Sequence, residues 1–207
     1  MSEKSDRDSE REETLTADAV VVAGPAWVAS ALLRDVDVTL SGLLARIPYA
    51  GVATINLIFR RDQIPILPSA AGFVVPAIEG RSLIACTFSS QKWADRTPDD
   101  LVVLRAFVGG ALHAHHLDRD DATVVSAVMR DLHELLQIHA EPVRSVVTRW
   151  PRAMAQYHVG HLARLAEIRS AEVQVPGLAL VGNGYEGVGI PDIIGQADFA
   201  AERLATA

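Results

Sequence analysis

Four glycines gather in one short stretch, residues 182–189, near the carboxyl end of the sequence. The apolar run 177–181 precedes this stretch, and apolar residues at helical spacing follow it over 193–204. The pattern predicts a strand, a glycine-rich turn and a helix in that order. Backbone without side chains lets a large flat group lie against the turn, and a helix directs unpaired N–H groups and partial positive charge from its first turn. Pro191 suits that first turn because its missing N–H is not needed there.

We expect this turn to bind a ring system that becomes partly anionic, such as a reduced flavin at its N1/C2 carbonyl edge. The string Gly182-x-Gly184-x-x-Gly187 also matches the dinucleotide fingerprint, but that fingerprint requires a second strand and an acidic ribose ligand about twenty residues further on. The sequence runs only to Ala207, and the Asp192 carboxylate would repel a pyrophosphate. An ordinary glycine-rich connection between a strand and a helix is the alternative.

Three segments carry a resemblance to a known family. Residues 181–192 (VGNGYEGVGIPD) resemble the C-terminal flavin motif of the protoporphyrinogen oxidase family, a group of amine-oxidase-like flavoproteins. Residues 150–162 (WPRAMAQYHVGHL) resemble the segment just upstream, at a fitting spacing. The strand, turn and helix predicted over 14–33 contain the string DAVVVAGPA, which resembles a third segment, although Gly24 stands where the family usually has Thr. The resemblance covers only the C-terminal half of the family's fold.

The resemblance implies FAD as the cofactor and a porphyrinogen as the substrate. In such enzymes hydride passes to flavin N5 and dioxygen reoxidises the flavin, so no catalytic side chain is expected from this chain. The implied cofactor-binding residues are Gly182, Asn183, Gly187, Val188, Gly189, Ile190, Asp192 and Tyr157. Tyr157 could equally anchor a loop to the core. The family's ADP-binding turn lies upstream of the matched segments, so we expect the isolated chain to bind FAD weakly or not at all.

Short apolar strands are predicted over 51–60, 72–76, 82–88 and 101–108, and they indicate a mainly antiparallel sheet. By resemblance this sheet binds the substrate, a molecule that is apolar in its middle and acidic at its rim. The implied substrate-binding residues are Ala71, Gly72, Val74 and Phe107. The residues alone favour the alternative that Val74 and Phe107 are core positions of the sheet.

The expected fold class is α/β (α+β), with part of a flavin-binding domain and a mainly antiparallel substrate-binding domain with covering helices. Residues 1–13 are predicted to form a disordered acidic leader. We expect 14–35 and 176–207 to form the partial FAD-binding domain and 36–175 to form the substrate-binding domain. A strand is predicted over 14–23, and its valine run at 20–22 is expected to be buried on both faces.

Helices are predicted over 121–139, capped by Asp120-Asp121, and over 159–173, and a strand is predicted over 143–150. An aperiodic loop that lines a pocket is expected over 150–157. His113, His115 and His116 could suggest a metal site, but their spacing favours a solvated loop, and we expect no metal.

Composition excludes several classes of protein. The 207 residues carry a formal net charge of −7, which gives no electrostatic footprint for nucleic acid. Cys86 is the only cysteine, so an internal disulfide is excluded and a reducing cytoplasm is the expected location. The most apolar run, 17–33, is too short and broken to span a bilayer, so we expect at most peripheral membrane contact.

Three functional hypotheses follow from the sequence. The chain could be the C-terminal portion of an FAD-dependent porphyrinogen oxidase, completed by a separate N-terminal half or a homo-oligomer. It could be a non-catalytic module that binds porphyrin without flavin, or a relic with a structural role or none. Protoporphyrinogen and coproporphyrinogen remain equally open as substrates.

Overall fold

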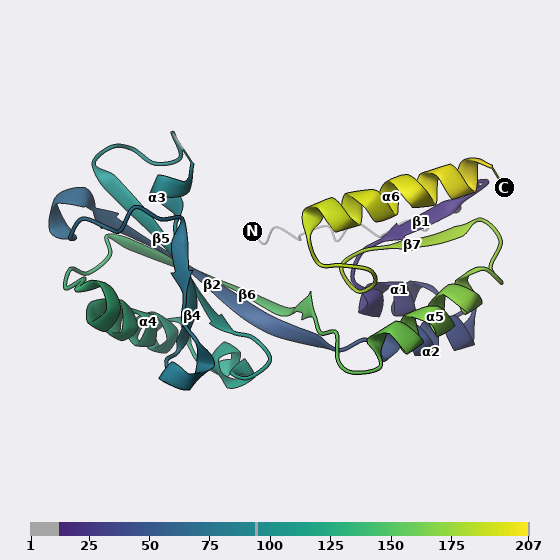
Figure 1. Cartoon of the computed structure of the whole chain (residues 1–207), viewed down its shortest axis with the longest axis horizontal. Coiled ribbons are helices and arrows are strands. Elements are labelled where there is room, and N and C mark those ends of the chain that lie inside the picture. Colours follow the sequence, from purple (N-terminus) through teal and green to yellow (C-terminus); the bar gives the residue numbers. More distant parts are fainter. Residues whose placement is uncertain (1–12, 94, 207) are drawn as a thin grey trace, which may run out of the picture. The chain divides into compact units, whose positions relative to one another are not determined.

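The computed structural model describes residues 13–93 and 95–206 (Figure 1). All but the last residue of the predicted acidic leader therefore lies outside the described residues. The chain divides into two compact units. The first contains the residues up to Leu44 and those from Leu162 onward, and the second runs from Ala45 to His161.

The first unit is built on two parallel strands, at the two places where the sequence predicts a strand, although the first begins at Val20 rather than at residue 14. Strand β1 (Val20–Ala23) pairs with β7 (Leu178–Val181), and Val20 stands opposite Leu178. Four helices accompany this pair: α1 (Ala26–Leu32), α2 (Val38–Ala45), α5 (His161–Glu172) and α6 (Ile190–Ala205).

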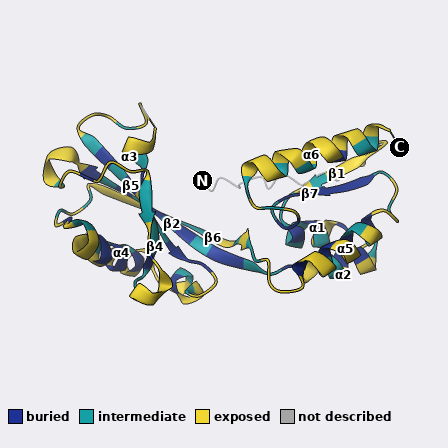
Figure 2. Ribbon diagram, in the orientation of Figure 1, coloured by how far each residue is buried: buried dark blue, intermediate teal, exposed yellow. Residues whose placement is uncertain are grey.

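The two strands differ in burial (Figure 2). All of β7 is buried, whereas Val20 and Val21 of β1 are 54% and 46% exposed. The prediction of a strand buried on both faces at 20–22 is therefore wrong. In the described part of the chain β1 has a strand neighbour at one edge only. The faces of β1 are also incompletely covered, because about half of the Val20 and Val21 side chains stays accessible to solvent.

The unit boundaries differ from the domain boundaries expected from sequence, because α2 and most of α5 belong to the first unit rather than to the substrate-binding domain. The Ser41 hydroxyl of α2 donates a hydrogen bond of 2.8 Å to the Ser30 carbonyl of α1. Leu44 of α2 and Ile168 of α5 are fully buried. The alternation of hydropathy along the chain does not show against which sheet a helix packs.

The second unit contains a five-stranded sheet, which is antiparallel as predicted, and its strand order is β3-β4-β5-β2-β6. The strands are β2 (Tyr49–Arg60), β3 (Gly72–Val74), β4 (Leu83–Phe88), β5 (Leu101–Gly109) and β6 (Arg144–Ala155). The short helical turns between them are Arg61–Gln63, Ala77–Glu79, α3 (Ser89–Lys92) and Ala114–Asp118.

Strand β6 is longer than predicted, because it continues through the segment 150–155 that was expected to be a loop. A proline within a sheet is tolerated at an edge, where its missing N–H breaks no ladder. Strand β6 pairs only with β2, and its register shifts opposite Ala50 and Val52. Pro151 lies in this irregular edge region.

Helix α4 (Asp121–Leu136) covers one face of this sheet. Its residues Val124, Val128 and Leu132 join a core cluster with Ile55 and Leu57 of β2. The predicted cap is confirmed, because the Asp120 carboxylate accepts a hydrogen bond of 2.9 Å from the Thr123 N–H. None of the helices in the described part of the chain has the length and hydropathy needed to span a bilayer.

The histidine cluster is not the solvated loop that the sequence predicts, because His116 is buried within the 3-10 turn Ala114–Asp118. Burial, followed by the positive charges of His115 and Arg119, lowers the pKa of His116. Within 13–93 and 95–206 no group of three or more His, Cys, Asp or Glu side chains is arranged to hold a metal ion.

Cys86 is buried in the core of the second unit, and burial raises the pKa of its thiol to about 12. At pH 8 we expect the thiol to react with a disulfide reagent about a thousandfold more slowly in the folded chain than in urea, from its thiolate fraction alone. Since the folded-state pKa is raised, the stability that the protonated thiol contributes is complete below pH ~9 and is lost as the pH rises towards 12. Rapid labelling without denaturant would contradict this burial.

Candidate functional site

The two parallel strands of the first unit end side by side at glycines. The Gly24 N–H donates a hydrogen bond of 3.1 Å to the Val181 carbonyl. Gly182 has a φ of +153°, and a Cβ atom built there would come within 2.6 Å of the Gly24 carbonyl oxygen. In open α/β sheets, ligands bind just beyond the carboxyl ends of parallel strands. The glycine-rich turn therefore begins at the edge where a ligand is expected.

The turn leads into α6, whose first residues carry Asp192. The Asp192 carboxylate accepts a hydrogen bond of 3.2 Å from the Gly189 N–H. It also fills the space beside Gly187, where a Cβ atom would lie 2.6 Å from Asp192 Oδ2. Asp192 therefore folds back over the turn and fixes its shape, and its negative charge is favourable at the start of a helix.

The second half of the turn is open to solvent, whereas Gly182, Gly184 and Tyr185 in its first half are buried. Val188 is 61% exposed and Ile190 is 75% exposed, while Gly187, Gly189 and Asn183 are half-buried. The first hydrogen bond of α6 runs from the Ile193 N–H to the Gly189 carbonyl. A flat group can therefore approach the backbone of residues 187–190.

A cavity of about 620 Å³ lies between α5, β7 and α6. It borders the turn at Glu186 and Asp192, but none of the residues 187–190 lines it. The cavity and the exposed backbone of the turn are therefore two distinct features of this unit.

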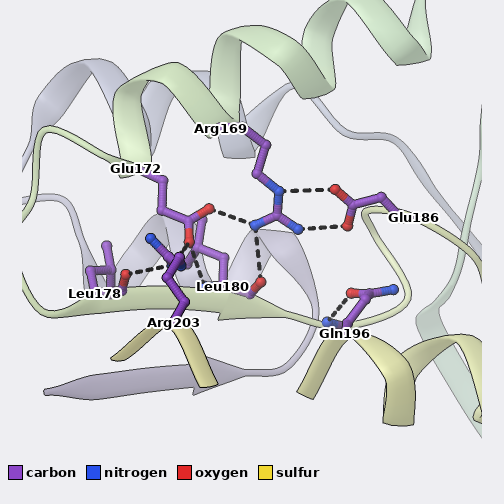
Figure 3. A network of polar contacts seen from close by, with 8 residues as sticks. Arg169, Glu172, Leu178, Leu180, Glu186, Gln196 and Arg203 are labelled. Atoms are coloured by element: carbon purple, nitrogen blue, oxygen red, sulfur yellow. Dashed lines mark hydrogen bonds and ion pairs between the residues drawn. The ribbon is translucent and has the colours of Figure 1, made fainter. Parts of the chain in front are cut away.

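A network of charged side chains surrounds Glu172, which is only 2% exposed (Figure 3). Its carboxylate accepts hydrogen bonds from Arg169 Nη1 at 2.5 Å and from Arg203 Nη2 at 2.7 Å. It also accepts one of 3.2 Å from the Leu180 N–H of β7. The two arginines donate to the carbonyls of Leu180 and Leu178, each at 3.1 Å. The network thereby satisfies backbone groups along the edge of β7 that faces away from β1.

The same network reaches the glycine-rich turn through Arg169. Its Nε and Nη2 donate to the two carboxylate oxygens of Glu186, at 2.9 and 2.6 Å. Its guanidinium also lies 5.1 Å from the ring centre of Tyr185, a fully buried residue of the turn. Burial alone lowers the pKa of Arg169, but the hydrogen bonds to Glu186 and Glu172 outweigh it and raise the pKa above its ordinary value.

Sequence reasoning missed Arg169, Glu172 and Arg203 as supports of the turn. The only signal available was the i, i+3 spacing of Arg169 and Glu172, which puts opposite charges on one helix face. Because that pattern is common on solvated helices, it could not reveal a buried carboxylate.

The predicted substrate residues lie on or beside one face of the second unit's sheet, opposite α4. Val74, Ala85, Phe107 and Thr54 stand directly opposite one another on β3, β4, β5 and β2. Val74 and Phe107 therefore lie two strands apart, at a spacing of about 10 Å. Val74 is 78% exposed, which excludes the alternative that it is a core residue.

Gly72 and Ala71 serve the fold at the edge of this face. A Cβ atom on Gly72 would come within 2.2 Å of the Cys86 carbonyl oxygen, so the residue is glycine because two backbones approach closely. The Ala71 carbonyl accepts a hydrogen bond of 2.9 Å from the Phe88 N–H. Ala71 itself is exposed beside this edge.

Tyr157 belongs to the second unit, whereas the other seven predicted cofactor-binding residues belong to the first. Its ring stacks on that of His161, with ring centres 3.9 Å apart and an interplanar angle of 10°. The structure thus brings seven of the eight residues together, and the role of Tyr157 still rests on the resemblance.

Comparisons with known proteins agree with this arrangement. The coproporphyrinogen III oxidase of Bacillus subtilis (strain 168) is 34% identical over 93% of the chain, which covers 41% of that protein. The chloroplastic protoporphyrinogen oxidase of Nicotiana tabacum is 28% identical over 91% of the chain, which covers 36% of it. The chain therefore spans about two fifths of the length of the curated relatives that it matches.

A crystal structure from Exiguobacterium sp. 255-15, which carries a provisional protoporphyrinogen oxidase assignment, superposes with a TM-score of 0.76 at 31% identity. The alignment covers 92% of this chain and 42% of that one. Reduced UDP-galactopyranose mutase gives a TM-score of 0.75 at 14% identity, which shows likeness of fold alone.

The family model described as flavin containing amine oxidoreductase matches residues 3–205, nearly the whole chain. With the glycine-rich turn at the carboxyl ends of two parallel strands and a separate antiparallel sheet, the chain belongs to the flavin-containing amine oxidoreductase family.

Proposed function

We propose that the chain forms the C-terminal portion of an FAD-dependent porphyrinogen oxidase of haem biosynthesis. The single observation that carries this proposal is the exposed glycine-rich turn at the ends of β1 and β7, in a chain whose relatives are named for porphyrinogen oxidation. When bound, FAD would accept hydride from the porphyrinogen and return the electrons to dioxygen.

Within this proposal the backbone of 187–190 holds the edge of the flavin ring. The positive end of α6 lies at the same place and favours negative charge there. Asn183, Gly182 and Asp192 complete the cofactor contacts by shaping the two ends of the turn. Ala71, Gly72, Val74 and Phe107 bind the substrate, with the sheet as its support.

Coproporphyrinogen III is the substrate that we favour. Bacterial relatives named coproporphyrinogen III oxidase are 34% and 36% identical to this chain, in Bacillus subtilis and Staphylococcus aureus, whereas the chloroplastic protoporphyrinogen oxidase of Nicotiana tabacum is 28% identical. Protoporphyrinogen is the alternative substrate.

The flavin site is completed by a strand added at the open edge of β1, either from a separate N-terminal half or from a second copy of the chain. The N–H groups of Val20 and Gly24 donate to the carbonyls of Gly177, just before β7, and Val181, at its end. The backbone of Val21 and Ala23 therefore faces the other edge. The Glu172 carboxylate accepts a hydrogen bond at the outer edge of β7, so that edge is covered. Val21 of β1 is about half exposed, and the outer edge of β1 can accept a neighbouring strand.

A chimera tests the function. The portion of the Bacillus subtilis enzyme that this chain does not match would be joined to residues 14–206 of the chain. We expect the chimera to purify with FAD, seen as absorbance near ~450 nm, and to consume dioxygen with coproporphyrinogen III, whereas the chain alone does neither. A folded chimera without flavin, or a yellow active chain alone, would contradict the proposal.

Substitution of Val21 by proline in the chimera tests the open edge. Proline removes the N–H that points away from β7 and leaves the β1–β7 hydrogen bonds intact. We therefore expect FAD retention to fall at least about tenfold. A tenfold fall corresponds to the loss of roughly one net hydrogen bond together with the packing that supports it. Val21→Thr keeps the N–H and the branched side chain, and it should retain FAD. Equal retention by both variants would show that no strand pairs there.

A further inference from the structure

We propose that Arg105 binds a carboxylate of the porphyrin-type substrate on the open face of the second unit's sheet. This inference rests on the proposed function, because it assigns a residue to the recognition of the acidic rim of that substrate. The substrate residues predicted from the sequence are all small or apolar, so none of them could pair with the carboxylates at the rim of the porphyrinogen.

Arg105 shares the face with the proposed substrate residues. In β5 it is two residues from Phe107, so both side chains project from the same side of the sheet. Its cross-strand neighbours are Thr87 of β4 and Asn56 of β2, and Thr87 in turn stands opposite Gly72. Arg105 is exposed, while its neighbours in β5, Leu104 and Ala106, are fully buried on the α4 side. The cation therefore stands directly beside the apolar row of Val74, Ala85 and Phe107.

One neutral hydrogen bond positions the guanidinium. Its Nε donates to Asn56 Oδ1 at 2.9 Å, and in the described part of the chain no carboxylate forms an ion pair with it. Arg81, Arg149 and Arg169 are instead held by carboxylates at 2.5 to 2.6 Å. Because Asn56 accepts only from Nε, the two Nη nitrogens of Arg105 can donate to another acceptor.

The face of the sheet around Arg105 favours the binding of an anion from solvent. The positions of β2, β3, β4 and β5 that project from this face carry no acidic side chain. A guanidinium with free outer nitrogens presents parallel N–H donors that match the two oxygens of a carboxylate. A porphyrinogen lying over Val74, Ala85 and Phe107 would place its apolar middle on these residues and a rim carboxylate within reach of Arg105, one row of the sheet away.

The test measures the binding of coproporphyrin III and of its tetramethyl ester to the whole chain by fluorescence quenching. The variant Arg105→Gln removes the cation, and Arg130→Gln removes an exposed arginine from α4 on the covered side of the sheet. We expect Arg105→Gln to weaken binding of the acid about tenfold, the value of one charge-assisted hydrogen bond, and to leave binding of the ester unchanged. Arg130→Gln should change neither, and Arg105→Lys should restore only part of the loss because it lacks the planar fork.

Each result decides between the inference and the proposed function. If Arg105→Gln weakens the binding of the acid and of the ester equally, or changes neither, Arg105 does not recognise a carboxylate. Porphyrin binding by the sheet would still stand. If the unsubstituted chain binds neither compound, the sheet is no porphyrin site in this chain, and both the inference and the proposed substrate face are overturned. A change of similar size in Arg130→Gln would show a general effect of net charge and would also overturn the inference.

Discussion

Glu172→Gln is expected to lower the free energy of unfolding of the first unit by about 2–3 kcal/mol. The substitution keeps the shape of the side chain but replaces the carboxylate oxygen shared by Arg203 and Leu180 with a neutral amide. Loss of one partner from a buried pair costs about 3–5 kcal/mol. We expect a cost below that range, because Arg169 and Arg203 remain about one third exposed and can be hydrated. The amide nitrogen would also face the guanidinium donors.

Urea unfolding followed by far-UV circular dichroism measures this change, and amide hydrogen exchange of β7 locates it. Glu167→Gln in the same helix removes an exposed carboxylate, and it should change stability by less than about 0.5 kcal/mol. We also expect Glu172→Gln to increase exchange at the Leu180 N–H, which loses its charged acceptor. Equal stability of the two variants would mean that the edge of β7 does not depend on the buried charge.

Gly182→Ala has the second large expected effect, because the new methyl group has no space. Its Cβ would lie 2.6 Å from the Gly24 carbonyl oxygen, a backbone atom, and the φ of +153° is unfavourable for alanine. Strain of this kind costs about 1–3 kcal/mol, and relief requires the ends of β1 and β7 to separate. We therefore expect destabilisation of about 2–3 kcal/mol and, in the FAD-binding chimera, loss of flavin, since the glycine-rich turn begins at this residue.

Gly42→Ala is the matched control. Gly42 lies within α2, and a Cβ atom there meets nothing within 4 Å. Alanine at a helical position without a clash stabilises by about 0.4–1 kcal/mol, so the two glycine substitutions should have opposite signs. Thermal unfolding of both variants and FAD content of the two chimeras are the measurements. If Gly182→Ala were as stable as the parent and kept FAD, the close contact between the two strand ends would be refuted.

Local pattern was enough to predict most elements. The apolar run 178–181 and the glycines after it predicted β7, the turn and α6, because a strand, a turn and an amphipathic helix each leave a periodic signature in neighbouring residues. Asp120 predicted the start of α4 for the same reason. Strand β6 was predicted too short, because Pro151 signals a break and its tolerance at an edge depends on which strand lies opposite.

The sequence by itself determined that a bare, glycine-rich backbone meets a helix start near the carboxyl end, and that short strands form an antiparallel sheet. Only the tertiary structure decided that Val20 and Val21 remain exposed and that Glu172 is buried between two arginines. It also decided that Arg105, beside Phe107, has no acidic partner among residues 13–93 and 95–206. The physical reason is that burial and ion pairing depend on residues brought together from distant parts of the chain. Backbone conformation and periodicity depend mainly on neighbours in sequence.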